Sequence, residues 1–194
     1  MKKVRIFLLT KSIGAYLNAL ARIRPGKAQR LAYRFFSEPR KGRLSPTALP
    51  ELLKDVPRTS LRFENYTFEA YRWPGGPKTI LLVHGWESNV ARWEPLLPLL
   101  RETGHTIVAI DAPAHGLSPG KEFTVPRYAA FINVAMREFG PFAMIGHSIG
   151  GAASLYAQHL APHPALQKLV ILGAPADLQV IAQNYIDILG LGTK

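Results

Sequence analysis

A serine lies between two glycines in the segment Gly146-His147-Ser148-Ile149-Gly150, between an apolar run at 142–145 and a helical pattern at 149–160. A serine on a sharp strand-to-helix turn projects its hydroxyl above the sheet, and glycines beside it remove β-carbons that would collide there. The amino end of the following helix offers free N–H groups to a developing oxyanion. We therefore predict that Ser148 is a nucleophile in acyl transfer. The alternative is a glycine-rich turn whose serine has no chemical role.

A second loop, His84-Gly85-Trp86, follows the apolar run at 79–83. A loop at this place can aim a backbone N–H at the substrate oxygen, opposite the N–H that follows the serine. We expect the amides of Trp86 and Ile149 to form an oxyanion hole, in which loss of one donor typically costs ~10²–10³ in rate. We interpret Gly85 as part of the loop structure and His84 as a structural residue of the same loop.

A third loop, residues 111–118 (DAPAHGLS), follows the apolar run at 106–110. Asp111 stands at the strand end, where its carboxylate can accept backbone N–H groups and tie the loop down. We predict a structural role for Asp111 and a loop-shaping role for His115.

The elements that must position these loops alternate along the chain. Buried apolar runs at 79–83, 106–110, 142–145 and 169–172 are separated by helical patterns at 90–103, 125–139 and 149–160. This alternation predicts an α/β fold, a mostly parallel sheet with helices on both faces. The patterns at 61–63 and 66–73 predict an antiparallel hairpin at one edge. Chemistry in such sheets lies at the carboxyl ends of the strands, where all three loops occur.

The segments HGW, DAPAHGLS and GHSIGG, with Leu172-Gly173-Ala174-Pro175 after the last strand, together resemble the α/β-hydrolase family from about residue 61 onward. The resemblance implies a serine hydrolase that cleaves a carboxylic ester, thioester or amide of a small-molecule acyl substrate through an acyl-enzyme on Ser148. It implies no cofactor and no metal. A serine at this position, in place of an aspartate, argues against the dehalogenase branch.

The sequence departs from the family pattern after the serine. The family places its acid and then its histidine after the nucleophile, but only 46 residues follow Ser148. None of the histidines, at 84, 105, 115, 147, 159 and 163, occupies the position of the base, and Asp177 stands where a minority of the family places the acid. We expect the last strands to be missing and the 194-residue chain to be inactive or impaired.

Three explanations of this departure stay open. The chain is a truncated hydrolase, or a partner chain completes the sheet and supplies the histidine, or the chain descends from a hydrolase and is non-catalytic. The last case makes it a binding module, associated with a membrane or a partner through its N-terminal helices.

The net charge of +11 is concentrated in the first third of the chain. Residues 1–62 hold 15 Lys/Arg and 3 Asp/Glu, whereas residues 63–194 hold 9 and 10. Apolar stripes at 6–23 and 28–36 predict two basic amphipathic helices, and four prolines at 37–60 predict an extended connector. We expect residues 1–60 to form an extension and residues 61–194 the partial hydrolase domain.

The basic helices have three interpretations. They pack on the domain behind them, they lie on an anionic membrane surface, or they form a signal peptide with Ala19-Leu20-Ala21 as the cleavage site. We expect a cytoplasmic protein with peripheral membrane contact, because no run of 18 uncharged apolar residues indicates a transmembrane helix. Nucleic-acid binding is not expected, because the charge lacks a reading module. The 47% of apolar residues excludes a disordered chain, and zero cysteines exclude disulfides.

Overall fold

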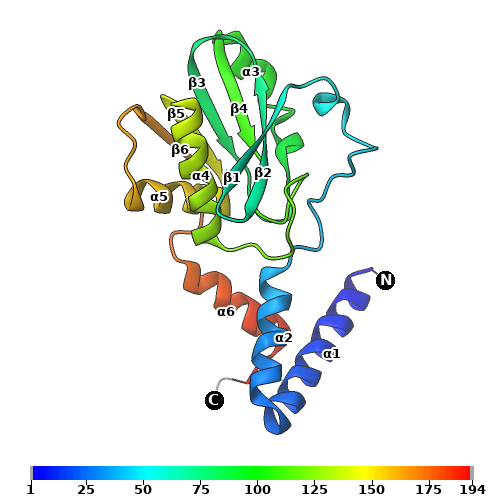
Figure 1. The fold of residues 1–194 in the computed structure, drawn as a ribbon. Coiled ribbons are helices and arrows are strands. Elements are labelled where there is room, and N and C mark those ends of the chain that lie inside the picture. The colour runs from blue at the N-terminus through cyan, green and yellow to red at the C-terminus, as the bar shows by residue number, and fades with distance from the viewer. Residues whose placement is uncertain (1, 193–194) are drawn as a thin grey trace. The chain divides into compact units, whose positions relative to one another are not determined.

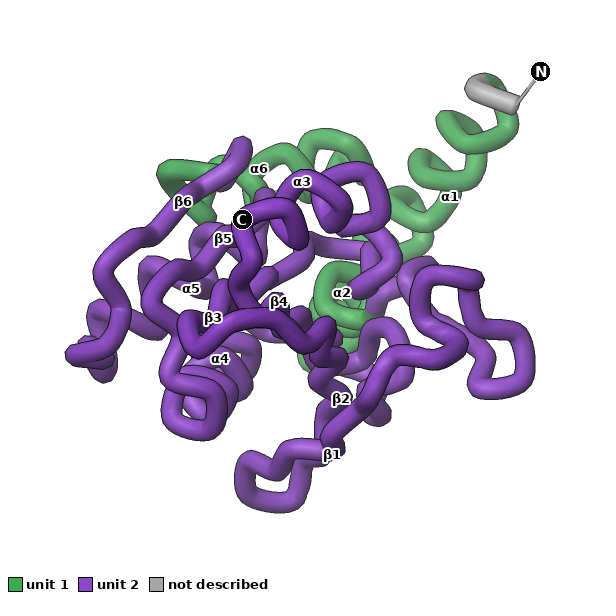
Figure 2. Tube along the Cα trace, turned by 90° about the horizontal axis from the view of Figure 1, so that it is seen from above, with its two compact units in different colours: residues 1–38, 175–194 green, residues 39–174 purple. Residues whose placement is uncertain are grey.

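The computed structural model of the chain describes residues 2–192. The chain divides into two compact units, which Figure 2 distinguishes by colour: unit 1 combines residues up to 38 with residues from 175 onward, and unit 2 comprises residues 39–174. This division differs from the boundary expected at residue 60. The connector belongs to unit 2, where Leu53 is fully buried in the core, and the last helix belongs to the same unit as the N-terminal helices.

Unit 2 is built on a six-stranded sheet with the order β1-β2-β4-β3-β5-β6. The strands are β1 (Arg58–Phe63), β2 (Tyr66–Trp73), β3 (Gly76–Val83), β4 (His105–Ile110), β5 (Ala143–His147) and β6 (Lys168–Leu172). β4, β3, β5 and β6 are parallel to one another, whereas β2 pairs antiparallel with both β1 and β4. The predicted mostly parallel sheet with an edge hairpin is confirmed.

Helices cover both faces of this sheet (Figure 1). One face carries the 3-10 helices η1 (Glu51–Leu53) and η2 (Val90–Trp93) with α3 (Leu97–Glu102), and the other carries α4 (Val125–Phe139) and α5 (Ile149–Leu160). Because side chains alternate along a strand, Ile80 and Leu82 of β3 pack with Leu97 on the first face. On the other face, the ring of Phe68 stacks on Phe131 of α4 at 4.2 Å between centroids.

The structure departs from the predicted continuous helix at 90–103. The segment forms η2 and then the short helix α3, because Pro95 and Pro98 lack the N–H groups that a continuous helix would use. By contrast, α4 and α5 span the residues that the sequence predicts. Thr124 caps α4, since its hydroxyl accepts a hydrogen bond from the Arg127 amide at 3.3 Å.

Unit 1 consists of α1 (Lys2–Ile23), α2 (Pro25–Ser37) and α6 (Leu178–Leu189). α2 and α6 are in contact, because the Tyr185 hydroxyl donates to the Ala32 carbonyl at 3.1 Å and the Phe36 and Tyr185 rings meet edge to face. The segment Val4–Ile23 of α1 is long and apolar enough to cross a membrane, with a mean hydropathy of 1.2 in its 18-residue window. A search for uncharged runs overlooks this helix, because isolated cations interrupt its apolar residues.

Candidate functional site

Ser148 lies at the turn between β5 and α5, with φ 54° and ψ −130°. A serine in this region carries backbone strain, which persists only where the surrounding structure imposes it. Here the packing of the neighbouring glycines imposes it. A β-carbon at Gly146 would lie 2.6 Å from the Gly151 Cα, and one at Gly150 would collide with the His84 carbonyl. The Ser148 amide also donates to the Leu172 carbonyl of β6 at 2.8 Å, which fixes the turn to the next strand.

The loop after β3 is packed directly against this turn. A β-carbon on Gly85 would lie 3.0 Å from both the Ser148 Cβ and the His147 carbonyl oxygen. Trp86 follows Gly85 in the sequence, and Ile149 follows Ser148. Within residues 2–192, neither of these two backbone amides donates a hydrogen bond to a protein atom. Ile149 is the first residue of α5, where the helix dipole adds positive potential. Backbone amides without a protein acceptor are the kind of donor from which an oxyanion hole is built.

His84 is fully buried, and both of its ring nitrogens are bonded within the loop. Its Nδ1 donates to the Gly85 carbonyl at 2.8 Å, and its Nε2 accepts from the Ala112 amide at 3.0 Å. This pattern fixes the neutral tautomer, and burial lowers the pKa of His84 to about 3. The Asp111 carboxylate lies 3.8 Å from Nε2, but no ion pair forms, because that nitrogen is an acceptor.

Asp111 is buried and accepts three hydrogen bonds. The donors are the Tyr71 hydroxyl at 3.0 Å, the Val90 amide at 3.2 Å and the Leu117 amide at 2.9 Å. Burial raises the pKa of Asp111 to about 6, although the three donors oppose that shift. Through these hydrogen bonds Asp111 joins three segments: its own loop at Leu117, the end of the loop after β3 at Val90, and β2 at Tyr71. A side chain at Gly116 would collide with its carboxyl group.

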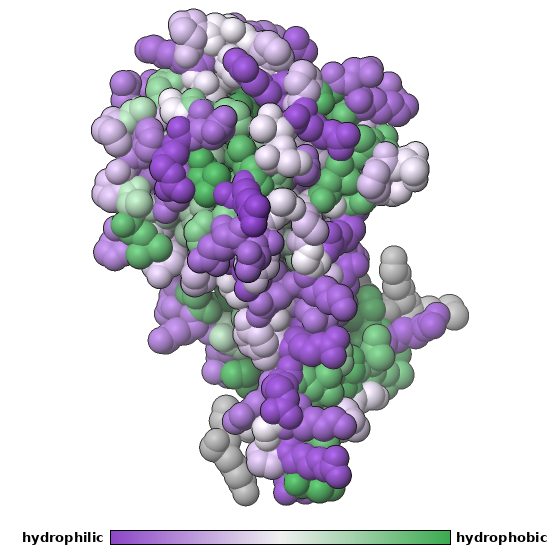
Figure 3. All heavy atoms as spheres, viewed as in Figure 1, coloured by the Kyte–Doolittle hydropathy of each residue, from purple (hydrophilic) through white to green (hydrophobic). Residues whose placement is uncertain are grey.

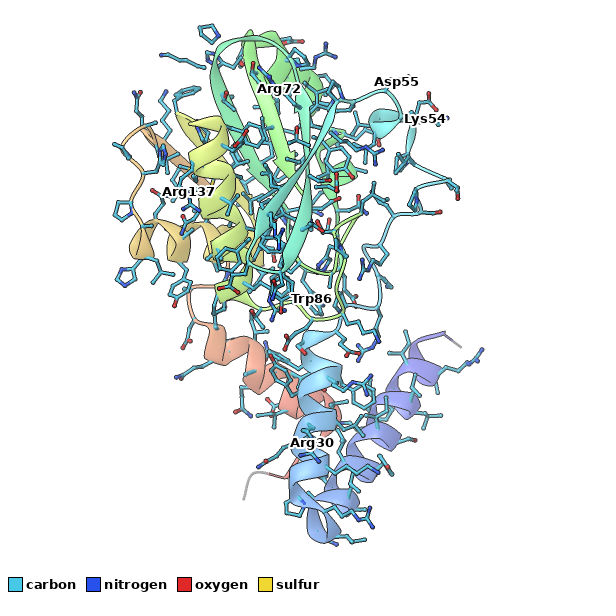
Figure 4. The ribbon with its side chains drawn as sticks, viewed as in Figure 1. Arg30, Lys54, Asp55, Arg72, Trp86 and Arg137 are labelled. Atoms are coloured by element: carbon cyan, nitrogen blue, oxygen red, sulfur yellow. The ribbon has the colours of Figure 1, made fainter. Side chains whose placement is uncertain are left out.

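His115 connects the two loops in a similar way. Its Nε2 accepts from the Glu87 amide at 3.0 Å, and its Nδ1 donates to the Pro113 carbonyl at 2.8 Å. Burial lowers the pKa of His115. The Trp86 ring packs edge to face on His115 and on Phe123. These contacts hold the tryptophan side chain against the segment between β4 and α4. Figure 4 labels Trp86 in unit 2.

His147 makes a contact that no sequence motif predicts. Its Nε2 accepts a hydrogen bond from the Arg92 guanidinium of η2 at 2.6 Å, so the neutral ring carries its proton on Nδ1. Nδ1 is buried and has no partner within the described residues, and it faces Gly85, where a β-carbon would lie 3.2 Å away. Burial, followed by the charge of Arg92, lowers the pKa of His147. The His147 ring therefore packs against the loop that follows β3.

The remaining candidate residues lie elsewhere. His105 begins β4, at the end of the parallel strands opposite the turn that carries Ser148, and it packs on Phe142. His159 is exposed ten residues along α5, about 15 Å from the turn by helical rise, and His163 Nδ1 accepts from the Ala165 amide. Asp177 caps α6 by accepting from the Gln179 amide at 2.8 Å. Within residues 2–192, no histidine hydrogen-bonds the Ser148 hydroxyl.

Comparisons with known proteins agree with this geometry. A family model described as alpha/beta hydrolase fold matches residues 78–189. The chain is 34% identical over 106 residues to a serine hydrolase-like protein of Danio rerio, covering 51% of this chain and 31% of that protein. It is 32% identical over 113 residues to the pimeloyl-[acyl-carrier protein] methyl ester esterase of Neisseria meningitidis, covering 58% and 42%. The chain thus spans less than half the length of both relatives.

Solved structures with the same fold include two enzymes. The Pyrococcus furiosus esterase Pf2001 gives a TM-score of 0.61 at 18% identity, covering 81% of this chain and 70% of that one. The thioesterase domain from the curacin biosynthetic pathway gives 0.56 at 22% identity, covering 71% and 54%. At these identities the likeness concerns the fold alone. The family model, by contrast, matches more than half of the chain, and on that match the protein belongs to the α/β-hydrolase family, among relatives described as serine hydrolase-like.

Proposed function

We propose that this protein is a serine hydrolase that cleaves a carboxylic ester, thioester or amide through an acyl-enzyme on Ser148. The observation that carries the proposal is the pair of unbonded amides, Trp86 and Ile149, beside a serine held at φ 54°. The names of two relatives, a methyl ester esterase and a monoglyceride lipase, favour esters within this class.

In the proposed reaction, the Ser148 oxygen attacks the carbonyl carbon while a base takes the hydroxyl proton. The carbonyl oxygen becomes an oxyanion that accepts hydrogen bonds from the two amides. Collapse of this intermediate breaks the bond to the leaving group, which takes up the proton. Water then attacks the acyl-serine by the same route and releases the acid.

Residues 2–192 provide no histidine that could take the proton from the Ser148 hydroxyl. His84 and His115 have both ring nitrogens bonded within loops, and His147 accepts from Arg92. We therefore propose that the histidine comes from polypeptide beyond these residues, in a longer chain or a partner chain. The 194-residue chain alone should then turn over esters negligibly, since a serine hydroxyl without a base is a weak nucleophile.

Two measurements test these statements separately. Boron NMR with the phenylboronate anion, in mildly alkaline buffer, reports whether Ser148 forms a protein-bound adduct next to the amides. In this exchange the Ser148 oxygen replaces one boron-bound hydroxide, which leaves as water with the serine proton, so no histidine is needed as a base. We expect an adduct in the wild type and none in Ser148→Ala. Hydrolysis of p-nitrophenyl acetate reports the base; we expect equal rates for the two proteins. No adduct would overturn the proposed nucleophile and favour a binding module, whereas robust Ser148-dependent turnover would overturn the missing base.

A further inference from the structure

The first turns of α1 expose apolar side chains on every side of the helix. Successive residues of a helix are about 100° apart, so a run of neighbours covers the whole circumference. Each exposed side chain in this run has between 55% and 62% of its surface accessible: Val4, Ile6, Phe7, Leu8 and Leu9. Figures 1 and 2 show this end of α1 extending away from α2 and α6, its partners in unit 1. Figure 3 shows the corresponding hydrophobic surface over α1.

The later turns of α1 are held within unit 1. The Lys11 ammonium donates to the Asp187 carbonyl at 3.1 Å, and the Asn18 side chain donates to the Gly190 carbonyl at 2.8 Å. Between them, Gly14 lies so close to the Leu189 carbonyl that a β-carbon there would collide with it. α1 is therefore an anchored helix whose first two turns keep more than half of each of these apolar side chains exposed.

The surroundings of this apolar end are basic. The stretch from residue 1 to residue 37 contains no Asp or Glu. Arg5 lies within the apolar run and is exposed, and the exposed Arg24 and Arg30 lie further away in unit 1, beyond the other end of α1 and on α2, where Figure 4 labels Arg30. An apolar helix end that carries cations around it matches the chemistry of an anionic bilayer surface, where apolar side chains enter the acyl boundary and Lys and Arg contact phosphate headgroups.

We propose that unit 1 docks the protein peripherally on an anionic lipid bilayer, with Val4–Leu9 inserted at the headgroup–acyl boundary. The contacts of Lys11, Gly14 and Asn18 with the end of α6 favour docking along the surface over spanning, because a spanning α1 would have to break them or take α6 with it. This proposal does not depend on the activity of Ser148, and Ser148→Ala should bind vesicles as the wild type does.

Vesicle co-sedimentation of the full chain tests the apolar contact. We compare neutral phosphatidylcholine vesicles with vesicles of about one-third phosphatidylglycerol, using Leu9→Asp and, as matched control, Leu99→Asp in α3. Leu9 and Leu99 are 62% and 60% exposed, so both variants should fold. We expect binding to anionic vesicles, a loss of at least about tenfold in Leu9→Asp, and no loss in Leu99→Asp. Equal binding by the two variants would overturn the proposal.

Charge variants test the choice of lipid. Arg5→Gln removes the exposed cation within the apolar run, and Arg137→Gln removes an exposed cation of unit 2. We expect roughly fivefold weaker binding in Arg5→Gln only, and weaker binding of the wild type at high salt. Equal binding to neutral and anionic vesicles would contradict the electrostatic contact.

Two further outcomes point to other occupants of the apolar end, and each overturns the proposal. Membrane association that resists alkaline carbonate would indicate that α1 spans the bilayer. A concentration-dependent dimer that Leu9→Asp dissociates, in a protein that binds no vesicles, would indicate that a second copy covers Val4–Leu9. Light scattering after gel filtration measures the second case.

Discussion

Gly85 and Ser148 are in van der Waals contact across the sheet switch point, so that a β-carbon on Gly85 would lie 3.0 Å from the Ser148 Cβ. β3 lies between β4 and β5, and the chain passes from one side of β3 to the other in going from β4 to β5. The loops that leave β3 and β5 meet at this point, which is where open parallel sheets bind ligands. Trp86 and Ile149 follow these two residues directly in the sequence, so their amides belong to the same two packed turns.

Gly85→Ala should therefore weaken oxyanion binding. The added methyl group must push apart the two backbones that carry the donors, since it also meets the His147 carbonyl oxygen at 3.0 Å. We expect the affinity for phenylboronate to fall about tenfold, less than the loss of a whole donor would cost, because both amides remain but are displaced; boron NMR titration measures the affinity. Gly26→Ala in α2 is the control, because its β-carbon meets only the Arg30 side chain, at 3.7 Å. An unchanged affinity in Gly85→Ala would contradict the assignment of the donors.

Gly150→Ala should lower the stability of the protein. Its β-carbon would collide with the His84 carbonyl and lie 2.7 Å from the Val83 carbonyl oxygen, and backbone atoms of a central strand cannot move aside. Overpacking of this kind typically costs about 1–3 kcal/mol. Urea denaturation should show this loss, whereas Gly26→Ala should be neutral or slightly stabilising, because alanine is the better helix former. Wild-type stability in Gly150→Ala would show that α5 does not pack on β3 as described.

Arg92 should control the protonation of His147. Burial and the Arg92 charge both lower the pKa of this histidine, so Arg92→Gln should shift the pKa of His147 upward, toward its ordinary value. An NMR titration of the ring signals measures the shift. Arg101→Gln, which changes an exposed arginine of α3, should leave the titration unchanged. If the two variants titrate alike, the 2.6 Å contact between Arg92 and His147 does not persist in solution.

The sequence was sufficient for the strands of the sheet, for α4 and α5 and for the turn at Ser148, but not for contacts that depend on distant packing. Runs such as 79–83 and 106–110 predict strands because a sheet covered on both faces buries every residue, and the glycines around Ser148 predict the turn. Arg92 is 55 residues from its partner His147, and no motif joins them. Their contact depends on the 3-10 helix η2, whereas the sequence predicts a continuous helix over 90–103.

The division into units escaped prediction for a related reason. The prolines at 37–60 predict an extended connector, but they do not show that Leu53 enters the core of unit 2. Likewise, the pattern of α6 resembles that of any amphipathic helix. Only the hydrogen bonds that Lys11 and Asn18 donate to its carboxyl-terminal end show that α6 packs on α1.

The buried pair His84 and Asp111 should give opposite pH dependences of stability. The folded pKa of His84 lies at about 3, below its ordinary 6.5, so the unfolded chain binds the proton first and stability falls as pH drops below 6.5. The folded pKa of Asp111 lies at about 6, above its ordinary 3.8, so the folded chain binds the proton first and stability rises as pH drops from 6 to 3.8. Between pH 6 and 4 the two contributions oppose each other.

Removing either partner should expose the contribution of the other. Relative to wild type, Asp111→Asn should lose stability as pH falls from 6 to 4, and His84→Gln should gain it, each by about 1.4 kcal/mol per pH unit. Urea denaturation across this range measures both slopes. His159→Gln, at an exposed histidine of α5, is the control for the loss of a surface side chain. A relative slope near zero in either variant would contradict the shifted pKa of the buried group that this variant removes.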